Sequence, residues 1–176
     1  MQEPNYHVPR PFVRHFDASV CNLFPDVDKK SFKVLDVAAG TGMLGLELNK
    51  LGYTNIDALD MSQEMLNRAM MKNVYNKLIC AAMTDQRING IETAEYDALT
   101  CSSAVCTSHV RPSAFEEMVK IVKPGMRDME NISLSYSFRF FPAFVNTRSR
   151  LFRNLERSSD LKNVELSFYL NLNSSL

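Results

Sequence analysis

Two kinds of hydrophobic pattern alternate along the chain from about residue 33. The first is a short apolar run rich in β-branched residues and bounded by lysines, glycines or other polar residues, which is typical of a buried strand. Such runs predict strands at 32–38, 55–60, 77–83 and 96–105. The segment 84–95 lacks periodicity and is expected to be a loop.

The second pattern has the helical period. Residues 43–52 repeat leucine at helical spacing before a stop at glycine. Ser62 is expected to cap a second helix, and 112–125 predicts a third, in which Ser113 and Glu116 form an S-x-x-E capping box. The expected apolar faces are Met65, Leu66, Ala69 and Met70 in the second helix and Phe115, Met118, Val119 and Val122 in the third.

Strands that alternate with helices indicate an α/β fold, with a doubly wound, mostly parallel sheet. The binding crevice of such a sheet lies at the carboxyl ends of its strands. Asp36, the loop 40–42, Asp60 and the loop 102–109 all fall there.

The carboxyl-terminal segment, residues 126–176, contains hydrophobic patterns with a period of two. Residues 132–140 and 164–172 alternate apolar with polar side chains, which predicts half-exposed strands, and 147–158 is typical of a short basic helix. These strands either extend the sheet or lie poorly placed beside it. We therefore divide the chain into a core at 1–125 and a divergent segment at 126–176.

Composition narrows the class of protein. The chain has 176 residues, 45% of them apolar and 23% charged, which favours a single globular domain. Twenty acidic residues balance twenty basic ones, so neither nucleic acid nor an anionic membrane is indicated as a partner. The amino terminus is polar, with two prolines, and does not resemble a signal peptide. We expect a monomeric, cytoplasmic protein, with a nuclear location also open.

The four cysteines indicate no metal site. Cys21, Cys80, Cys101 and Cys106 form no C-x-x-C pair and have no histidine at ligand spacing. Cys80 and Cys101 lie in the predicted strands, where we expect them to be buried, reduced thiols.

The glycine loop carries the candidate chemistry. Gly40, Gly42 and Gly45 spell G-x-G-x-x-G, the dinucleotide fingerprint. Asp36, however, lies four residues before Gly40, where its carboxylate would repel a pyrophosphate and favour a ligand with an ammonium and a sulfonium group. Asp60 can accept two hydrogen bonds from a ribose diol, whether the ligand is NAD or an S-adenosyl compound. Gly45 is expected inside the following helix as a packing residue, so Gly45→Ala should leave cofactor binding largely intact.

The blocks "VLDVAAGTG", "IDALDMSQEML", "YDALTCSSAV" and "FEEMVKIVKPG" occur in this order and spacing within residues 3–125. In these blocks the chain resembles the class I S-adenosylmethionine-dependent methyltransferases, and most of all the methyltransferase-like proteins named after the Williams–Beuren syndrome chromosome region. The resemblance implies a Rossmann-like fold, S-adenosyl-L-methionine as cofactor, and an unidentified small molecule or protein as methyl acceptor.

The resemblance also implies roles for individual residues. Asp36 and the loop would line the methionine half of the cofactor, Asp60 would hold the ribose and Met61 would pack on the adenine. The complete set of implied cofactor-binding residues is Asp36, Ala38, Ala39, Gly40, Gly42, Asp60, Met61, Met83 and Ser102. His109, in the loop after the fourth strand, is either a general base that acts on the acceptor or a loop histidine bonded to backbone.

Three departures from the family accompany this resemblance. Ala81 and Ala82 stand where relatives usually carry Gly-Asp, and Asp85 is the nearby candidate to replace the acid. The segment 5–16 resembles the second amino-terminal helix of the family. The resemblance stops at Gly125, because the sequence after it does not resemble the fifth strand or the carboxyl-terminal antiparallel pair of the family. We therefore expect a form that is incomplete at both ends, with weak cofactor binding and weak activity.

Two alternatives stay open. One is a non-catalytic relative that binds the cofactor or acts as an interaction protein. The other is an NAD(P)-dependent oxidoreductase, which Gly45 favours and Asp36 opposes.

Overall fold

The computed structural model describes residues 10–102 and 110–123, together with the backbone of 132–136 and 168–170. Its helices are α1 (Arg10–Leu23), α2 (Met43–Lys50), α3 (Gln63–Met70) and α4 (Phe115–Ile121). Its strands are β1 (Val34–Val37), β2 (Ile56–Asp60), β3 (Lys77–Cys80), β4 (Ala98–Ser102), β5 (Ile132–Tyr136) and β6 (Phe168–Leu170). A 3-10 turn, Pro112–Ala114, precedes α4.

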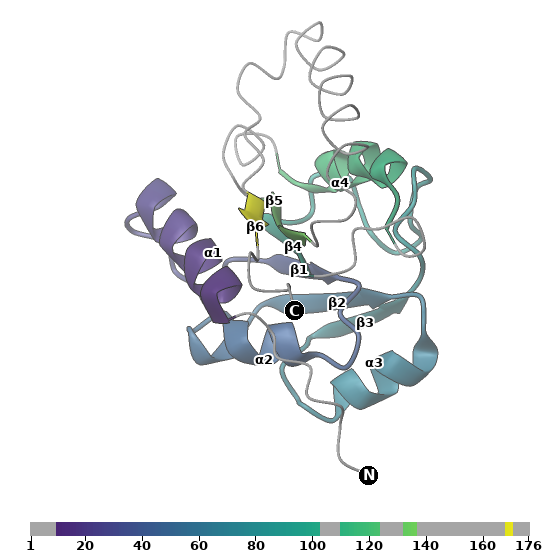
Figure 1. Cartoon of the computed structure of the whole chain (residues 1–176), viewed down its shortest axis with the longest axis horizontal. Coiled ribbons are helices and arrows are strands. Elements are labelled where there is room, and N and C mark those ends of the chain that lie inside the picture. The colour runs from purple at the N-terminus through teal and green to yellow at the C-terminus, as the bar shows by residue number, and fades with distance from the viewer. Residues whose placement is uncertain (1–9, 103–109, 124–131, 137–167, 171–176) are drawn as a thin grey trace, which may run out of the picture.

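The strands form one sheet in the order β3-β2-β1-β4-β5-β6, and all neighbouring strands are parallel (Figure 1). The α/β sheet expected from the sequence is confirmed. The strand order reverses at β1, where Asp36 pairs with Ala58 of β2 on one side and with Thr100 of β4 on the other. In such sheets the crevice beside this reversal, at the carboxyl ends of the strands, is the usual place for a ligand.

Helices cover both faces of the sheet. The first three helices lie on one face and α4 on the other (Figure 1). α1 forms because its apolar side chains fall on one stripe, and that stripe packs on α2 and the sheet. The buried residues of α1 are Phe12, Val13, Phe16 and Val20. On the opposite face α4 packs through Phe115, Met118, Val119 and Ile121.

Of the two predicted helix caps, one is confirmed and one is wrong. The Ser62 side chain accepts a hydrogen bond from the Met65 backbone N–H at 3.3 Å, so this predicted N-cap is confirmed. The capping box of Ser113 and Glu116 is wrong: α4 begins after Ala114 with no side-chain cap, because Ser113 lies inside the 3-10 turn that leads into the helix.

The apolar face of α3 is narrower than predicted. Leu66 and Ala69 are buried, but Met65 is 37% exposed and Met70 is 54% exposed. α3 lies on β2 and β3 at the edge of the sheet, where only the residues that face the small side chains Ala39 and Ala58 find a surface to cover them.

The position of β3 also corrects the prediction for Cys80. This thiol is exposed, because β3 is the edge strand of the sheet and its burial alternates, whereas Cys101 in the inner strand β4 is buried as expected. β3 ends at Cys80 and does not continue to residue 83. Cys106 lies outside the described residues.

The carboxyl-terminal segment adds strands to the same sheet. Of the two alternatives for the predicted strands, the structure supports extension of the sheet, because Ile132–Tyr136 forms β5 in parallel pairing with β4. The period-two pattern at 164–172 contains β6, which is parallel to β5. The predicted basic helix at 147–158 lies outside the described residues, and the division of the chain at residue 125 stays a prediction.

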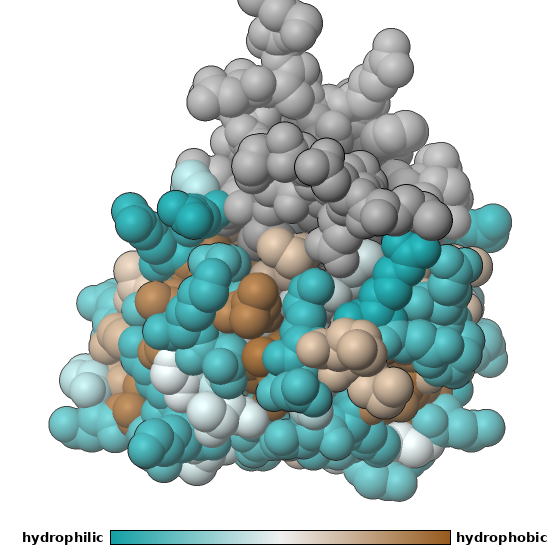
Figure 2. Space-filling model, turned by 90° about the horizontal axis from the view of Figure 1, so that it is seen from below, coloured by the Kyte–Doolittle hydropathy of each residue, from teal (hydrophilic) through white to brown (hydrophobic). Residues whose placement is uncertain are grey.

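The surface of the described part of the chain is mostly polar. Seen from below, it is largely hydrophilic with apolar side chains interspersed (Figure 2). The exposed large apolar side chains among the described residues belong to Met61, Met65, Met70 and Met71, on α3 or its flanks. Within the same residues, no helix is both long and apolar enough to cross a bilayer.

The core position of α2 gives a first prediction. Leu48 is fully buried between α1, α2 and the sheet, so Leu48→Ala should lower the free energy of unfolding by about 2–5 kcal/mol. Met71→Ala is the matched control, because Met71 is 76% exposed and its truncation should change the free energy by less than about 0.5 kcal/mol. Urea unfolding followed by circular dichroism measures both; equal losses would contradict this packing.

Candidate functional site

The loop between β1 and α2 has an unusual backbone. Ala38, Gly40 and Gly42 all adopt positive φ, at 55°, 54° and 81°. A left-handed alanine is uncommon, because its Cβ crowds the backbone. Backbone hydrogen bonds hold the loop against the end of β2: the Ala39 N–H donates to the Leu59 carbonyl at 3.1 Å. This turn aims the start of α2 away from the strand and leaves the loop at the crevice.

Asp60, the last residue of β2, anchors two segments. Its Oδ2 accepts a hydrogen bond from the Gly40 N–H at 2.8 Å, and its Oδ1 accepts one from the Ser62 N–H, also at 2.8 Å. Asp60 is only 8% exposed. A carboxylate oxygen has two acceptor positions, so each oxygen keeps one for a ligand.

A shallow pocket opens beside Asp60, with about 310 Å³ of empty space, part of it open to solvent. Its lining residues are Ala38, Leu59, Asp60, Met61, Ala81, Ala82, Met83 and Val110. Asp60 contributes the charged side chain and the others are apolar. An apolar lining with a single charged group is typical of small-molecule sites. The exposed Asp85 is not among the lining residues.

Asp36 lies deeper than the crevice. It is 1% exposed, and its two carboxylate oxygens accept hydrogen bonds from the Tyr75 hydroxyl at 2.7 Å and the Thr100 hydroxyl at 3.3 Å. Burial raises the pKa of Asp36 to about 7, and the nearby Asp60 raises it as well, although the hydrogen bonds oppose the shift. Among the described residues no cation forms an ion pair with Asp36.

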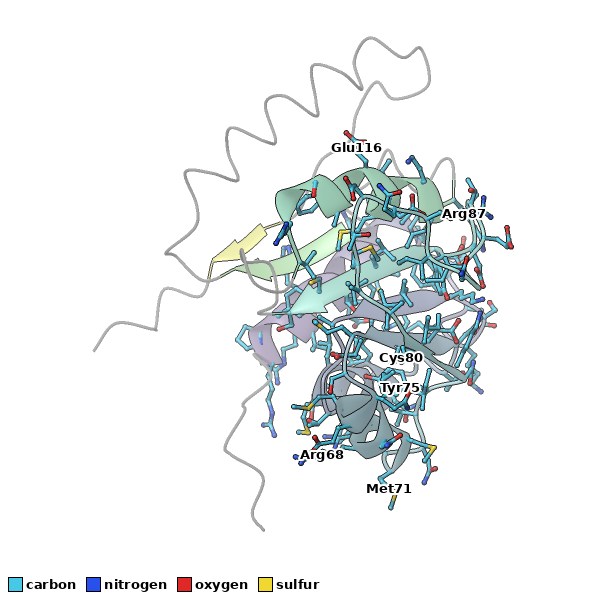
Figure 3. All side chains as sticks on the ribbon, turned by 90° about the vertical axis from the view of Figure 1, so that its right-hand side faces the viewer. Arg68, Met71, Tyr75, Cys80, Arg87 and Glu116 are labelled. Carbon is cyan, nitrogen blue, oxygen red and sulfur yellow. The ribbon has the colours of Figure 1, made fainter. Side chains whose placement is uncertain are left out.

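Tyr75, which follows α3, lies between the sheet and the helices below it (Figure 3). Its hydroxyl accepts a hydrogen bond from the Gly45 N–H at 3.2 Å while it donates to Asp36. A Cβ on Gly45 would lie 2.4 Å from the Tyr75 ring, and one on Gly42 would lie 2.9 Å from it. Gly45 is a packing residue inside α2, as expected. Tyr75 fills the space beside it and would have to move to admit alanine, and the expected retention of cofactor binding in Gly45→Ala stays a prediction.

The structure brings together much of the predicted site. Ala38, Asp60, Met61 and Met83 line the pocket, and Gly40 is bonded to Asp60. Ala39 and Gly42 lie on the inner side of the loop: Ala39 packs on Ala58 and Leu66, and Gly42 faces Ala69 and Tyr75.

Ser102, at the end of β4, lies level with Ala38, since Thr100 pairs with Asp36 two residues earlier. Its Oγ is buried and has no hydrogen-bond partner among the described residues. An unsatisfied buried hydroxyl is costly, and at a crevice it marks a place for a polar group of a ligand. His109 lies outside the described residues, so its role stays a prediction.

Sequence reasoning missed Tyr75 and Val110. Val110 lines the pocket from the segment after β4, and nothing in its local pattern indicates this. Tyr75 had an indirect signal: a glycine inside a helix, such as Gly45, is often there because another group approaches the helix closely. Among the described residues no cluster of His, Cys, Asp and Glu could hold a metal ion.

Comparison with known proteins adds independent information. The profile of a methyltransferase domain matches residues 34–125. Human methyltransferase-like protein 27 is 29% identical over 92 residues, which are 52% of this chain and 37% of that protein.

Two solved structures share the fold. A S-adenosylmethionine-dependent methyltransferase from Clostridium acetobutylicum has 25% identity and a TM-score of 0.52, over 67% of this chain and 48% of its own. The glycopeptide N-methyltransferase MtfA, complexed with sinefungin, has 18% identity and a TM-score of 0.51, over 71% and 56%. The chain thus spans little more than a third of the human relative and about half of these two structures.

The raised pKa of Asp36 predicts a pH dependence of stability. Between its ordinary pKa of about 4 in the unfolded chain and about 7 in the folded one, the native state binds the extra proton. The contribution of Asp36 to the free energy of unfolding therefore falls as pH rises through this window. Urea unfolding at about pH 5 and about pH 8 should show a smaller loss in Asp36→Asn than in the parent. An equal loss of stability in the parent and in Asp36→Asn would contradict a raised pKa of Asp36.

Alanine at the two loop glycines should lower the free energy of unfolding by different amounts. In Gly40→Ala the new Cβ would meet no atom within 4 Å, so only the positive φ should lower the free energy of unfolding, by about 1–2 kcal/mol. Gly42→Ala also has a positive φ, and its Cβ would lie 2.9 Å from Tyr75 and 3.0 Å from Ala69. Its free energy of unfolding should therefore fall by a further ~1–3 kcal/mol. Chemical unfolding of the two variants measures the difference, and equal stabilities would show that the loop is packed differently.

Proposed function

The chain belongs to the methyltransferase domain family, whose profile matches more than half of it, and on this premise we propose that its crevice binds S-adenosyl-L-methionine and that the protein transfers the methyl group to an acceptor. The observation that carries this proposal is the pairing of Asp60 with the apolar pocket at the carboxyl end of β2. Such a pair suits an adenosine: a ribose diol against a carboxylate and an apolar base against alanine and methionine side chains.

The glycine loop suits the rest of the cofactor. Gly40 has no atom within 4 Å of the position of a Cβ, so the backbone is open to close approach there. The Oγ of Ser102, which has no hydrogen-bond partner in the described part of the chain and lies level with Ala38, supplies a hydroxyl for a polar group of the ligand. These features lie around one crevice and fit an amino-acid moiety that extends from the ribose.

The charges near the loop favour a cationic ligand over a pyrophosphate. Asp36 and Asp60 lie on neighbouring strands, and the negative charge of Asp60 adds to the effect of burial in raising the pKa of Asp36. A pyrophosphate would add further negative charge to this region. The third glycine of the dinucleotide fingerprint, Gly45, is explained by the ring and hydroxyl of Tyr75, and no nucleotide phosphate is needed to account for it.

S-adenosylmethionine supplies a methyl group on a sulfonium, and a nucleophilic acceptor takes it by in-line displacement. Such a transfer depends mainly on alignment and on the exclusion of water, so the protein must hold the two reactants and needs little acid–base chemistry. Asp60 and the loop would hold the cofactor. We propose a small molecule or a protein as the acceptor, which would approach over the carboxyl ends of β1 and β4, with His109 as the candidate base.

A ligand cycle tests the role of Asp60. The parent should bind S-adenosylhomocysteine at least about tenfold more tightly than its analogue with a 2′,3′-dideoxyribose, because the diol donates to the carboxylate. In Asp60→Asn both ligands should bind weakly and with nearly equal affinity. Isothermal titration calorimetry measures the four values. The variant also weakens the hydrogen bonds from the Gly40 and Ser62 backbones. The resulting loss of affinity is the same for both ligands, so it cancels when their affinities are compared.

The control is Asp85→Asn, which lies outside the pocket and should keep the parental difference between the two ligands. If the parent does not distinguish the two riboses, Asp60 does not hold the diol. If the parent binds NADH and not S-adenosylhomocysteine, the proposed function is wrong and the oxidoreductase alternative replaces it. A chain that binds S-adenosylhomocysteine but forms none from S-adenosylmethionine with any acceptor is the non-catalytic relative.

A further inference from the structure

We propose that Tyr75 is a positioning residue for the cofactor loop: it holds the loop from the side opposite to the ligand, through the backbone of α2 and the carboxylate of Asp36. This inference rests on the proposed function, because the loop is the segment expected to hold the cofactor. Tyr75 belongs to none of the sequence blocks that resemble the family and does not line the pocket.

The hydroxyl of Tyr75 joins two elements of the site. It donates to Asp36 Oδ2 at 2.7 Å and accepts from the Gly45 N–H at 3.2 Å, so one oxygen bridges β1 and the first turn of α2. The Gly45 N–H belongs to the beginning of α2, where backbone donors have no partner within the helix. Tyr75 therefore satisfies a buried donor and ties the start of α2 to the strand.

The ring of Tyr75 adds a second restraint. It lies against Gly42 and Gly45 so closely that a Cβ at either position would come within 3.0 Å of it. Gly42 is the left-handed residue that ends the loop, and Ala69 of α3 presses on it as well. The ring thus sets how far α2 and the end of the loop lie from the sheet.

The loop is therefore held from two sides. On the crevice side Asp60 accepts the Gly40 N–H, and on the inner side Tyr75 accepts the Gly45 N–H. Asp36 is 1% exposed and lies on the inner side of the loop, so it acts on the loop through Tyr75 and through the Gly45 backbone. Loss of the Tyr75 hydroxyl should loosen the loop without removal of any atom that lines the pocket.

Asp36 links this arrangement to pH. The groups that face its carboxylate are the Tyr75 hydroxyl after α3, the Thr100 hydroxyl on β4, the Gly45 backbone on α2 and the Asp60 carboxylate on β2. When Asp36 is ionised it strengthens the Tyr75 hydroxyl as an acceptor for Gly45, because hydrogen bonds in a chain polarise one another. The environment of the Gly45 amide should therefore follow the ionisation of Asp36.

The test compares Tyr75→Phe with Tyr96→Phe in the full chain. Tyr96 is the matched control, because its buried hydroxyl donates to Asp57 Oδ2 at 2.9 Å, the same kind of bond, at the opposite end of the sheet. Tyr75→Phe should bind S-adenosylhomocysteine about tenfold more weakly, as one buried hydrogen bond implies, and Tyr96→Phe should bind like the parent. Calorimetry gives the affinities.

A second readout needs no ligand. In the parent, the NMR shift of the Gly45 amide proton should titrate around the raised pKa of Asp36, about 7. The amplitude of this titration should be smaller in Tyr75→Phe, in which only the direct contact between Asp36 and the Gly45 backbone remains, and unchanged in Tyr96→Phe. If Tyr75→Phe does not fold, Asp36→Asn replaces it, since that variant keeps the ring and should abolish the titration.

The outcomes separate the two proposals. Failure of the parent to bind S-adenosylhomocysteine overturns the proposed function and, with it, the role of Tyr75 toward the ligand. A parent that binds, beside a Tyr75→Phe that binds as tightly and keeps the full amplitude of the Gly45 titration, overturns the inference and leaves the function. Equal weakening by Tyr75→Phe and Tyr96→Phe also overturns it, because the effect would then be a general loss of stability.

Discussion

The two hydrogen bonds that Asp60 accepts, from the Gly40 and Ser62 backbones, are the interaction on which the rest of the site depends. β1 ends in the middle of the sheet, and the chain leaves it through a loop in which the Ala39 N–H still bonds to the backbone of β2 but the Gly40 N–H bonds to the Asp60 side chain. A buried donor without an acceptor costs about 1–3 kcal/mol, so a carboxylate at the end of the neighbouring strand makes this turn possible. The same side chain sets the start of α3 beside the pocket.

A comparison of the buried acids supports the proposal of a cationic ligand. Asp57, on the amino side of the sheet, accepts from Tyr96 and lies 3.4 Å from the Lys33 ammonium, which Glu95 also contacts. Its charge is therefore balanced within the protein. Asp36 has a tyrosine partner as well, but no described cation pairs with it, and it shares its surroundings with Asp60. The uncompensated negative potential lies at the end of the sheet where the pocket opens.

Much of the fold follows from local pattern. The strands at 34–37, 56–60 and 98–102 and the helix after Ser62 could be predicted, because burial on both faces requires continuous apolar runs and an N-cap requires a particular residue. The errors concern the surroundings of an element. Cys80 is exposed because β3 is at the edge of the sheet, and Met65 is exposed because α3 covers little of the sheet. The local sequence pattern does not indicate where in the fold either element lies.

The candidate site shows the same division between local and distant causes. Asp60 and the loop glycines stand in a recognisable pattern, whereas the bond between Tyr75 and Asp36 joins residues 39 positions apart. The G-x-G-x-x-G spacing is therefore ambiguous for a physical reason. A third glycine records only that something approaches the helix closely, and here a tyrosine side chain from the far end of α3 makes that approach. The motif constrains the backbone, and the groups packed around that backbone decide which ligand it can accept.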